Sequence, residues 1–251
     1  FWFRAMAGAV TSDPQEVYKL ESEIFGNTER KSRVVVRVKT QFLSDNFGKF
    51  KLLPHKNFTA LAIKPEEEFE IELIAKDNSF FELAISSFWM SVTLGGWGRR
   101  SRRGAGTTKI LNVEGDFEEQ IKKFLSRPLK KQLDFVKEQF SSSLRAYPAN
   151  QKAVWPYLRK VYQWEKTLSR PWDKNSPIYE IFNKHSSYLK VNGDCLGDRK
   201  PRYASPIIMR IVEKNNKYTI LFSILKTQDR CDKIIENFLK LVGKTMEVWH
   251  A

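Results

Sequence analysis

Apolar residues recur at two different spacings along the first 113 residues, and each spacing predicts a different element. Between residues 81 and 92 they recur every three or four positions, which predicts a helix with one buried face that ends at Gly95. That face comprises Phe81, Ala84, Ile85, Phe88, Trp89 and Val92. In residues 67–76 apolar residues alternate with acidic ones, which predicts a strand. The β-branched run over 33–39 predicts another strand.

The remaining elements of this first part follow from capping residues and β-branched content. Residues 1–25 predict a helix that is interrupted near residues 8–14, with Ser12 or Asp13 as N-cap and Pro14 in the first turn. Residues 107–113, "TTKILNV", predict a strand. A further strand upstream would complete the βαββαβ order of a ferredoxin-like or RRM-like unit. Because the chain begins abruptly with "FWFRAM", we expect that first strand to be missing from it.

The second part begins with a helical block and then returns to strands. Prolines separate helical segments that we expect near 117–144, 151–168 and 176–189. Residues 202–225 then predict two strands joined by the turn "KNNK", and residues 231–244 predict an amphipathic helix.

These elements predict an α+β protein with two ferredoxin-like (RRM-like) domains in tandem and a helical insertion. The N-terminal domain is expected over residues 1–115, and the C-terminal domain over 116–251 with the helical block at 116–190.

The charge of the chain bears on its partners rather than on its fold. The net charge is +14 and the isoelectric point is near 9.7, and such an excess favours a polyanion, most often nucleic acid. A membrane surface is the other polyanion, but no long apolar run or signal-like start suggests insertion or secretion. Cys195 and Cys231 are far apart without a CxxC motif, so we expect reduced thiols and a cytoplasmic protein; a single disulfide is the alternative.

The most informative stretch is "LGGWGRRSRRGAG", residues 94–106, which we call the Gly/Arg loop. Its glycines permit positive φ and close approach of a ligand, and consecutive N–H groups can cradle an anion. Its four arginines present forked donors that suit phosphate oxygens. Trp97 can stack on an unpaired base or pack on its own domain. The loop lacks the Lys-Ser/Thr pair of a P-loop and precedes a strand rather than a helix.

Catalytic and metal-binding chemistry finds little support in the sequence. His55, His185 and His250 are the histidines, and none has metal-ligand spacing to another His or Cys. We expect His250 to be exposed and His185 to act as a cation at a helix end. No Ser/His/Asp or Cys/His arrangement is apparent, so no cofactor, metal or small-molecule substrate is expected.

Three segments together resemble the RAMP superfamily of CRISPR-associated proteins: "FWFRAM" at 1–6, "GGWGRRSRRGAG" at 95–106 and "RYASPIIMRI" at 202–211. Members carry a Gly- and Arg-rich loop between the second helix and the last strand of a ferredoxin-like domain, where this loop stands. The aromatic-rich first segment is similar to that of the first subunit of the Cmr complex, the type III-B RNA-targeting effector. The upstream strand and the Lys/Gly turn of that family are absent, and the helical block does not map onto its motifs.

The resemblance implies a non-catalytic RNA-binding subunit that acts in antiviral defence. Its partners would be guide RNA (crRNA), target RNA and other Cmr subunits. The RNA-binding residues that it implies are Arg4, Gly95, Gly96, Gly98, Arg99, Arg100, Arg102, Arg103, Gly104 and Gly106. The residues themselves add Trp97 and a second basic cluster, Lys109, Lys200, Arg202 and Arg210. Contacts to phosphates predict binding that is salt-sensitive and weakly dependent on RNA sequence.

Two other functions stay open at this point. Some RAMP proteins are metal-independent endoribonucleases that mature guide RNA, and His55 is the candidate general acid or base for that role. A free-standing RRM-like protein is the third interpretation, but the strands at 33–39 and 67–76 lack the aromatic motifs that read bases on such a sheet.

Overall fold

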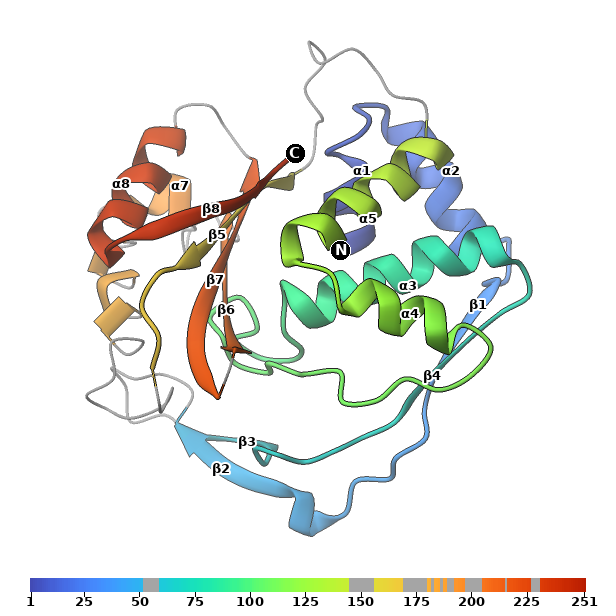
Figure 1. Ribbon diagram of the computed structural model, residues 1–251, viewed down its shortest axis with the longest axis horizontal. Coiled ribbons are helices and arrows are strands. Elements are labelled where there is room, and N and C mark those ends of the chain that lie inside the picture. The colour runs from blue at the N-terminus through green and yellow to red at the C-terminus, as the bar shows by residue number, and fades with distance from the viewer. Residues whose placement is uncertain are drawn as a thin grey trace.

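A four-stranded antiparallel sheet lies between two layers of helices in this α+β protein (Figure 1). The computed structural model describes residues 1–51, 59–144, 156–168, 180–181, 183–185, 187–188, 192–196, 205–214, 216–226 and 231–251. The strands of the sheet are β5 (Tyr157–Trp164), β6 (Ile207–Lys214), β7 (Lys217–Lys226) and β8 (Thr245–His250). Their order across the sheet is β6-β7-β5-β8, so β6 is an edge strand.

Alternation along β6 and β7 divides their side chains between the two helical layers. Ile207, Met209 and Ile211 of β6 belong to the cluster that packs against α8 (Asp232–Val242). Ile208 lies on the opposite face, toward the N-terminal helices, and Arg210 shares its side of the strand. β7 is buried along most of its length, as expected for a central strand with both faces covered.

The C-terminal helical layer contains α7 (Gly193–Leu196) and α8. Ile235, Phe238, Leu239 and Val242 form the buried face of α8, which confirms the amphipathic helix predicted at 231–244. Cys195 in α7 and Cys231, the residue before α8, are joined by a disulfide with Cα atoms 5.1 Å apart. The expectation of two reduced thiols is therefore wrong, because the fold brings together two cysteines that are distant in sequence.

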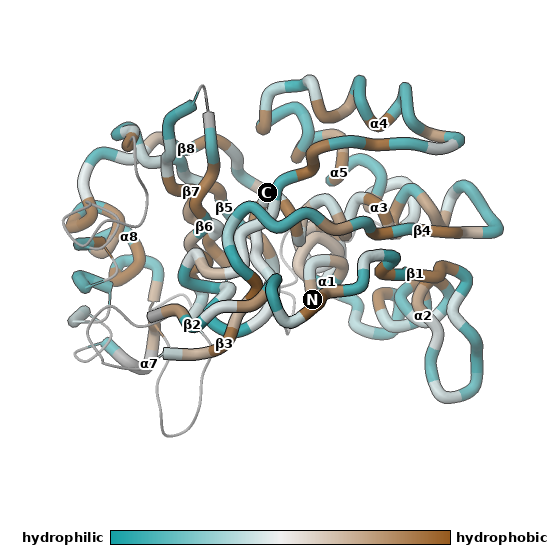
Figure 2. The backbone as a smooth tube through the Cα atoms, turned by 90° about the horizontal axis from the view of Figure 1, so that it is seen from below, coloured by the Kyte–Doolittle hydropathy of each residue, from teal (hydrophilic) through white to brown (hydrophobic). Residues whose placement is uncertain are grey.

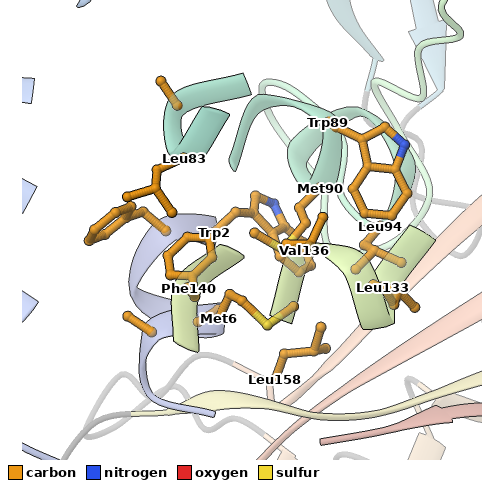
Figure 3. Close-up of a cluster of buried hydrophobic side chains, with 14 of the residues drawn as sticks. Trp2, Met6, Leu83, Trp89, Met90, Leu94, Leu133, Val136, Phe140 and Leu158 are labelled. Carbon is orange, nitrogen blue, oxygen red and sulfur yellow. The ribbon is translucent and has the colours of Figure 1, made fainter. Parts of the chain in front are cut away.

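The N-terminal layer packs α1 (Trp2–Ala7), α3 (Asn78–Thr93) and α5 (Leu129–Ser143) onto the other face of the sheet. In Figure 3 the side chains of Met6, Met90 and Phe140 converge above Leu158 of β5. α2 (Pro14–Phe25) and α4 (Glu118–Leu125) lie on the outer side of these helices (Figure 1). One hydrophobic cluster thus joins residues from both predicted domains, and the domain boundary at residue 115 stays a prediction.

Two small antiparallel pairs lie apart from the large sheet (Figures 1 and 2). β1 (Val34–Val38) pairs with β4 (Ile71–Ala75), which confirms the strands predicted at 33–39 and 67–76. β2 (Phe47–Lys51) pairs with β3 (Thr59–Ile63) after a short 3₁₀ turn at Ser44–Asn46. This second pair has no counterpart among the predicted elements.

The helix boundaries follow from their caps. The helix predicted at 1–25 is two helices, and the Asp13 carboxylate caps α2 by accepting from the N–H of Gln15 at 2.8 Å. Asp77 caps α3 in the same way through Ser79, and these hydrogen bonds lower the pKa of Asp77. The helical segment at 117–144 is confirmed as α4 and α5, and the described residues at 180–188 are helical.

Two predicted elements are wrong. Residues 107–113 are not a strand, because among the described residues no neighbouring strand supplies backbone hydrogen bonds to them. The sequence predicts a helix at 151–168, but the described part of that segment contains β5, which pairs with both β7 and β8. The two strands at 202–225 are confirmed as β6 and β7. No helix in the described part of the chain has the length and apolar character needed to cross a membrane.

Candidate functional site

The Gly/Arg loop leaves the end of α3 and closes on itself at a narrow neck. The N–H of Trp97 donates to the carbonyl of Gly106 at 2.9 Å. Gly106 has a φ of 66°, and a Cβ built there would lie 1.8 Å from the carbonyl oxygen of Trp97. Glycine is required at this position for both reasons, since a side chain would be strained and would also push the neck apart.

Replacing Gly106 with alanine should lower the free energy of unfolding by about 3 kcal/mol, since backbone strain and a clash add together. Gly98 is the matched control, because it has a φ of 82° but a Cβ added there would have no heavy atom within 4 Å. Gly98→Ala should therefore cost about 1 kcal/mol. Denaturant unfolding followed by tryptophan fluorescence compares the two variants. Equal losses would contradict the assigned role of the neck.

The second half of the loop adds onto the free edge of β6. The N–H of Met209 donates to the carbonyl of Arg102 at 2.9 Å, and Arg103 forms a parallel bridge with Met209. The Arg102 guanidinium donates to the carbonyl of Ser205 at 2.6 Å and lies 5.0 Å from the centre of the Phe1 ring. Burial lowers the pKa of both arginines, and the nearby Arg100 lowers that of Arg103 further.

The Arg210 side chain holds the chain on both sides of the loop tip by hydrogen bonds. One Nη donates to the carbonyl of Gly95 at 2.8 Å, and the other donates to the carbonyl of Thr108. The side chain is buried, and burial lowers its pKa to about 10. The sequence predicts that Arg210 contacts RNA; its guanidinium is instead engaged inside the protein, so the structure assigns it a positioning role.

Trp97 packs on its own domain rather than projecting from the loop. Its ring lies 5.7 Å from the rings of Phe69 and Phe88, measured between centroids, and its indole N–H donates to Ser91 Oγ at 3.2 Å. Of the two alternatives for this residue, the structure shows packing. The half-buried indole helps to hold the first part of the loop against α3.

The tip of the loop is the part that faces solvent. Gly98, Arg99 and Arg100 are exposed, whereas Arg102 and Arg103 are half-buried. Arg100 has a φ of 67°, and the N–H of Arg103 donates to its carbonyl at 2.8 Å. A non-glycine residue with positive φ is uncommon and is held there by the surrounding structure. The other loop glycines lie at its base, with Gly95 and Gly104 buried and Gly96 half-buried.

The remaining predicted cations do not form one cluster. Arg4 in α1 makes a forked contact with the Glu21 carboxylate of α2 at 2.8–2.9 Å, and its side chain stays exposed. Lys109 is exposed and pairs with Glu213 of β6 at 3.0 Å. Lys200 and Arg202 lie outside the described residues. Sequence reasoning missed the partners Glu21, Glu213 and Ser205, because only the tertiary fold brings them near the predicted site.

The histidines do not assemble a catalytic group in the described structure. His185 is buried against the Phe238 ring, and burial lowers its pKa to about 3, so the side chain is neutral at pH 7. Its predicted role as a helix-end cation is therefore wrong. His250 is about half exposed, as expected, with Glu247 3.7 Å away. His55 lies outside the described residues.

Comparisons with known proteins agree with this fold and this loop. Residues 1–109 match the model of the RAMP superfamily. The Cmr subunit Cmr1-2 of Pyrococcus furiosus is 32% identical over 143 residues, which cover 44% of this chain and 76% of that protein. Cmr1-1 of the same organism is 30% identical over 136 residues, which cover 48% of this chain but only 40% of that protein's length.

Two solved structures share the fold. The crystal structure of apo Cmr1 from Pyrococcus furiosus covers 99% of this chain and 88% of its own, with a TM-score of 0.65 and 20% identity. A chain of the type III-B Cmr-beta complex bound to cognate target RNA covers 96% and 91%, with a TM-score of 0.51 and 12% identity. The fold and its Gly/Arg loop are thus those of a RAMP protein. Within that superfamily, the chain belongs to the Cmr1 family of CRISPR proteins.

Proposed function

We propose that this chain is a non-catalytic, RNA-binding subunit of a type III-B CRISPR (Cmr) effector complex that acts in antiviral defence in the cytoplasm. Its partners are guide RNA (crRNA), target RNA and other Cmr subunits. The names of its Cmr1 relatives and the target RNA in the Cmr-beta structure support this proposal. The exposed tip of the Gly/Arg loop contacts RNA phosphates, and base pairing between guide and target supplies the sequence specificity.

The observation that carries the proposal is an exposed pair of arginines on a rigid base. Arg99 and Arg100 stand at the solvent-facing tip, while the neck, the edge of β6 and Arg210 fix the rest of the loop. Because the backbone below these two arginines is fixed, less conformational entropy is lost when they bind a phosphate. The loop therefore suits backbone contact rather than the reading of bases, since its one aromatic residue packs inward.

The fold is proposed to consist of two ferredoxin-like units. In the second half, the chain order strand–helix–strand–strand–helix–strand combines with the sheet order β6-β7-β5-β8, which is the split βαβ arrangement. In the first half, β1 and β4 supply its central hairpin, and α3 its second helix. The Gly/Arg loop then follows the second helix of the first unit and docks on an edge strand of the second.

Changing Arg99 and Arg100 together to alanine should weaken the binding of single-stranded RNA about tenfold at low salt. The plot of log affinity against log salt should become shallower by about 1.4, which is two lost phosphate contacts at about 0.7 each. Fluorescence anisotropy with the 251-residue chain at several salt concentrations measures both quantities. A variant with Lys19 and Lys233 changed to alanine removes the same charge from exposed sites on α2 and α8.

Three outcomes would count against the proposal. Equal losses in the loop variant and the charge-matched variant would mean that the loop is not the contact. Strong preference for one RNA over a scrambled one at equal salt would contradict backbone recognition. Cleavage of the RNA in the same tubes would overturn the non-catalytic role, and His55→Ala would then be the next variant to examine.

A further inference from the structure

A second group of cations surrounds the turn between α4 and α5. Residues 122–131, "KKFLSRPLKK", contain five cations and no acidic residue, and we call them the α4–α5 turn. The buried side-chain amide of Gln132 holds this turn in shape by donating to the carbonyls of Leu125 at 2.8 Å and Arg127 at 3.0 Å. The cations are therefore displayed on a defined backbone rather than on a loose linker.

Most of these cations have no anionic partner within the described part of the protein. Lys122 pairs with Glu118, and Arg127 lies 5.1 Å from the centre of the Phe135 ring. Lys123, Lys130 and Lys131 are exposed, and among the described residues none of the three has an ion pair.

Helix stability does not account for the two lysines at the start of α5. The first turn of α5 contains Lys130 and Lys131 and no acidic residue. Cations in that position oppose the helix dipole and lower helix stability. An external polyanion would compensate for this arrangement.

The α4–α5 turn adjoins the Gly/Arg loop. Leu94 at the start of the loop and Leu133 in α5 are fully buried in one cluster, and Figure 3 shows them next to each other. A cleft of about 2530 Å³ is lined by Arg99 and Lys109 on the loop side and by Lys123 and Arg127 on the side of the turn. The two basic segments therefore share one cleft in part, since Lys130 and Lys131 are not among its lining residues.

Acidic residues also line the cleft, including Glu213 of β6, which pairs with Lys109. Figure 1 shows α3 and α4 both ending on the side nearest the four-stranded sheet, where the loop and the turn lie. Glu82 and Asp116 line the cleft near the starts of these helices, at its other end.

We propose that the α4–α5 turn is a second phosphate-binding surface, and that it contacts the backbone of the same RNA strand that the Gly/Arg loop holds. This inference rests on the proposed RNA-binding function and extends the contact surface from the loop to α4 and α5. RNA is favoured over an acidic protein partner because Lys123 and Arg127 of the turn line the same cleft as Arg99 of the Gly/Arg loop. Flexible lysines give point-charge contacts to phosphates without reading bases.

The test changes Lys123, Lys130 and Lys131 to alanine in the 251-residue chain and titrates the same single-stranded RNA. A variant with Lys19, Lys233 and Lys240 changed to alanine removes the same charge from exposed positions on α2 and α8. The turn variant should bind about tenfold more weakly than wild type at low salt and lose up to about 2 from the salt slope. The control should change affinity less than about twofold.

A stability measurement and an alternative substitution exclude unfolding and side-chain truncation as causes of weaker RNA binding. The turn variant should melt no lower than wild type, because it removes cations from the positive end of α5. A second version with glutamine in place of the three lysines keeps long polar side chains and should lose the same RNA affinity. Preserved affinity in the glutamine version would overturn the proposal, since it requires charge.

The outcomes separate this inference from the proposed function. If the variant lacking Arg99 and Arg100 loses affinity but the turn variant matches its control, the second surface is wrong and the loop function stands. The second surface is equally wrong if the turn variant loses binding to an acidic partner protein and keeps its RNA affinity. If wild type binds no RNA, the proposed function and this inference both fail.

Discussion

Replacing Arg210 with methionine will lower the free energy of unfolding by about 4 kcal/mol, because two buried carbonyls lose their charged hydrogen-bond donor. The guanidinium bonds Gly95 before the loop tip and Thr108 after it, so both ends of the Gly/Arg loop lose their anchor. Methionine fills similar volume without a donor, which keeps the cavity contribution small. Chemical denaturation of the variant and wild type measures the loss.

Two control variants show whether the loss of stability comes from the place of Arg210 in the fold or only from the removal of a positive charge. Arg37 lies exposed on β1 and pairs with Glu72 at 3.4 Å, so Arg37→Met removes an equal charge and should cost less than about 1 kcal/mol. Arg210→Lys retains a cation but cannot donate to both carbonyls as the forked guanidinium does. Its loss in free energy of unfolding should lie between the losses of the other two variants. Losses of equal size in Arg210→Met and Arg37→Met would rule out the anchor.

The positioning role has a second readout in RNA binding. Under conditions where the variant stays folded, Arg210→Met should weaken RNA affinity because the tip loses its fixed base. In a chain in which Arg99 and Arg100 are already alanine, Arg210→Met should cause little further loss of RNA affinity. The side chains that Arg210 positions are absent from that chain. An additive loss in that background would show that Arg210 acts elsewhere.

Local sequence patterns were enough to predict the elements whose packing follows a regular period. The segment at 81–92 is helical as predicted, and Leu83, Ala84, Trp89 and Met90 pack into the core. The predicted buried face is partly wrong, because Phe81, Ile85 and Phe88 are half-buried and line the cleft. The two strands at 202–225 contain nearly continuous apolar runs because both of their faces are covered. The position of the Gly/Arg loop was likewise predictable, since glycine clusters end helices in any fold.

β5 was mistaken for a helix because its buried residues are spaced three apart. Leu158, Val161 and Trp164 are buried, which resembles a helical period. The pairing with β7 shifts register between Leu158 and Lys160, and the pairing with β8 shifts between Val161 and Tyr162. The first irregularity adds Arg159 to β5 and changes which face the next side chain of β5 meets, whereas the second adds Val248 to β8. The spacing of apolar residues within β5 cannot reveal a bulge, because a bulge is defined by how the strand pairs with its neighbour.

The parts of the site that sequence could not predict depend on long-range contacts. Alternation along β6 separates Arg210 from Ile207 and Met209, but only the tertiary fold shows that the loop covers its face. Half of the loop arginines are engaged at the edge of β6, so cation density alone overstated the exposed surface. The basic run at 122–131 is missing from the residues predicted to bind RNA, and its place beside the loop follows from the packing of α3 against α5.

Reduction of the disulfide between Cys195 and Cys231 will lower the free energy of unfolding by about 4 kcal/mol, the chain-entropy value for a loop of this length. The bridge closes a sequence separation of 36 residues and joins α7 to the residue before α8. α7 has four residues, too few to be stable as an isolated helix, so its attachment depends on packing and on this bond. Denaturant unfolding with and without a reductant measures the change.

A chain with both cysteines replaced by alanine is the control for this prediction. It should unfold at the midpoint of the reduced wild type and should not respond to the reductant. Titration of thiols in the denatured protein should find none before reduction and two afterwards, since the chain contains two cysteines. Protein purified without reductant could instead show two reactive thiols and an unfolding midpoint that the reductant does not change. That outcome would mean that the two cysteines are reduced, as their spacing in the sequence predicts. The stability of the C-terminal helical layer would then rest on the cluster around Phe238 and on the ion pairs of Asp232 with Arg159 and Lys226.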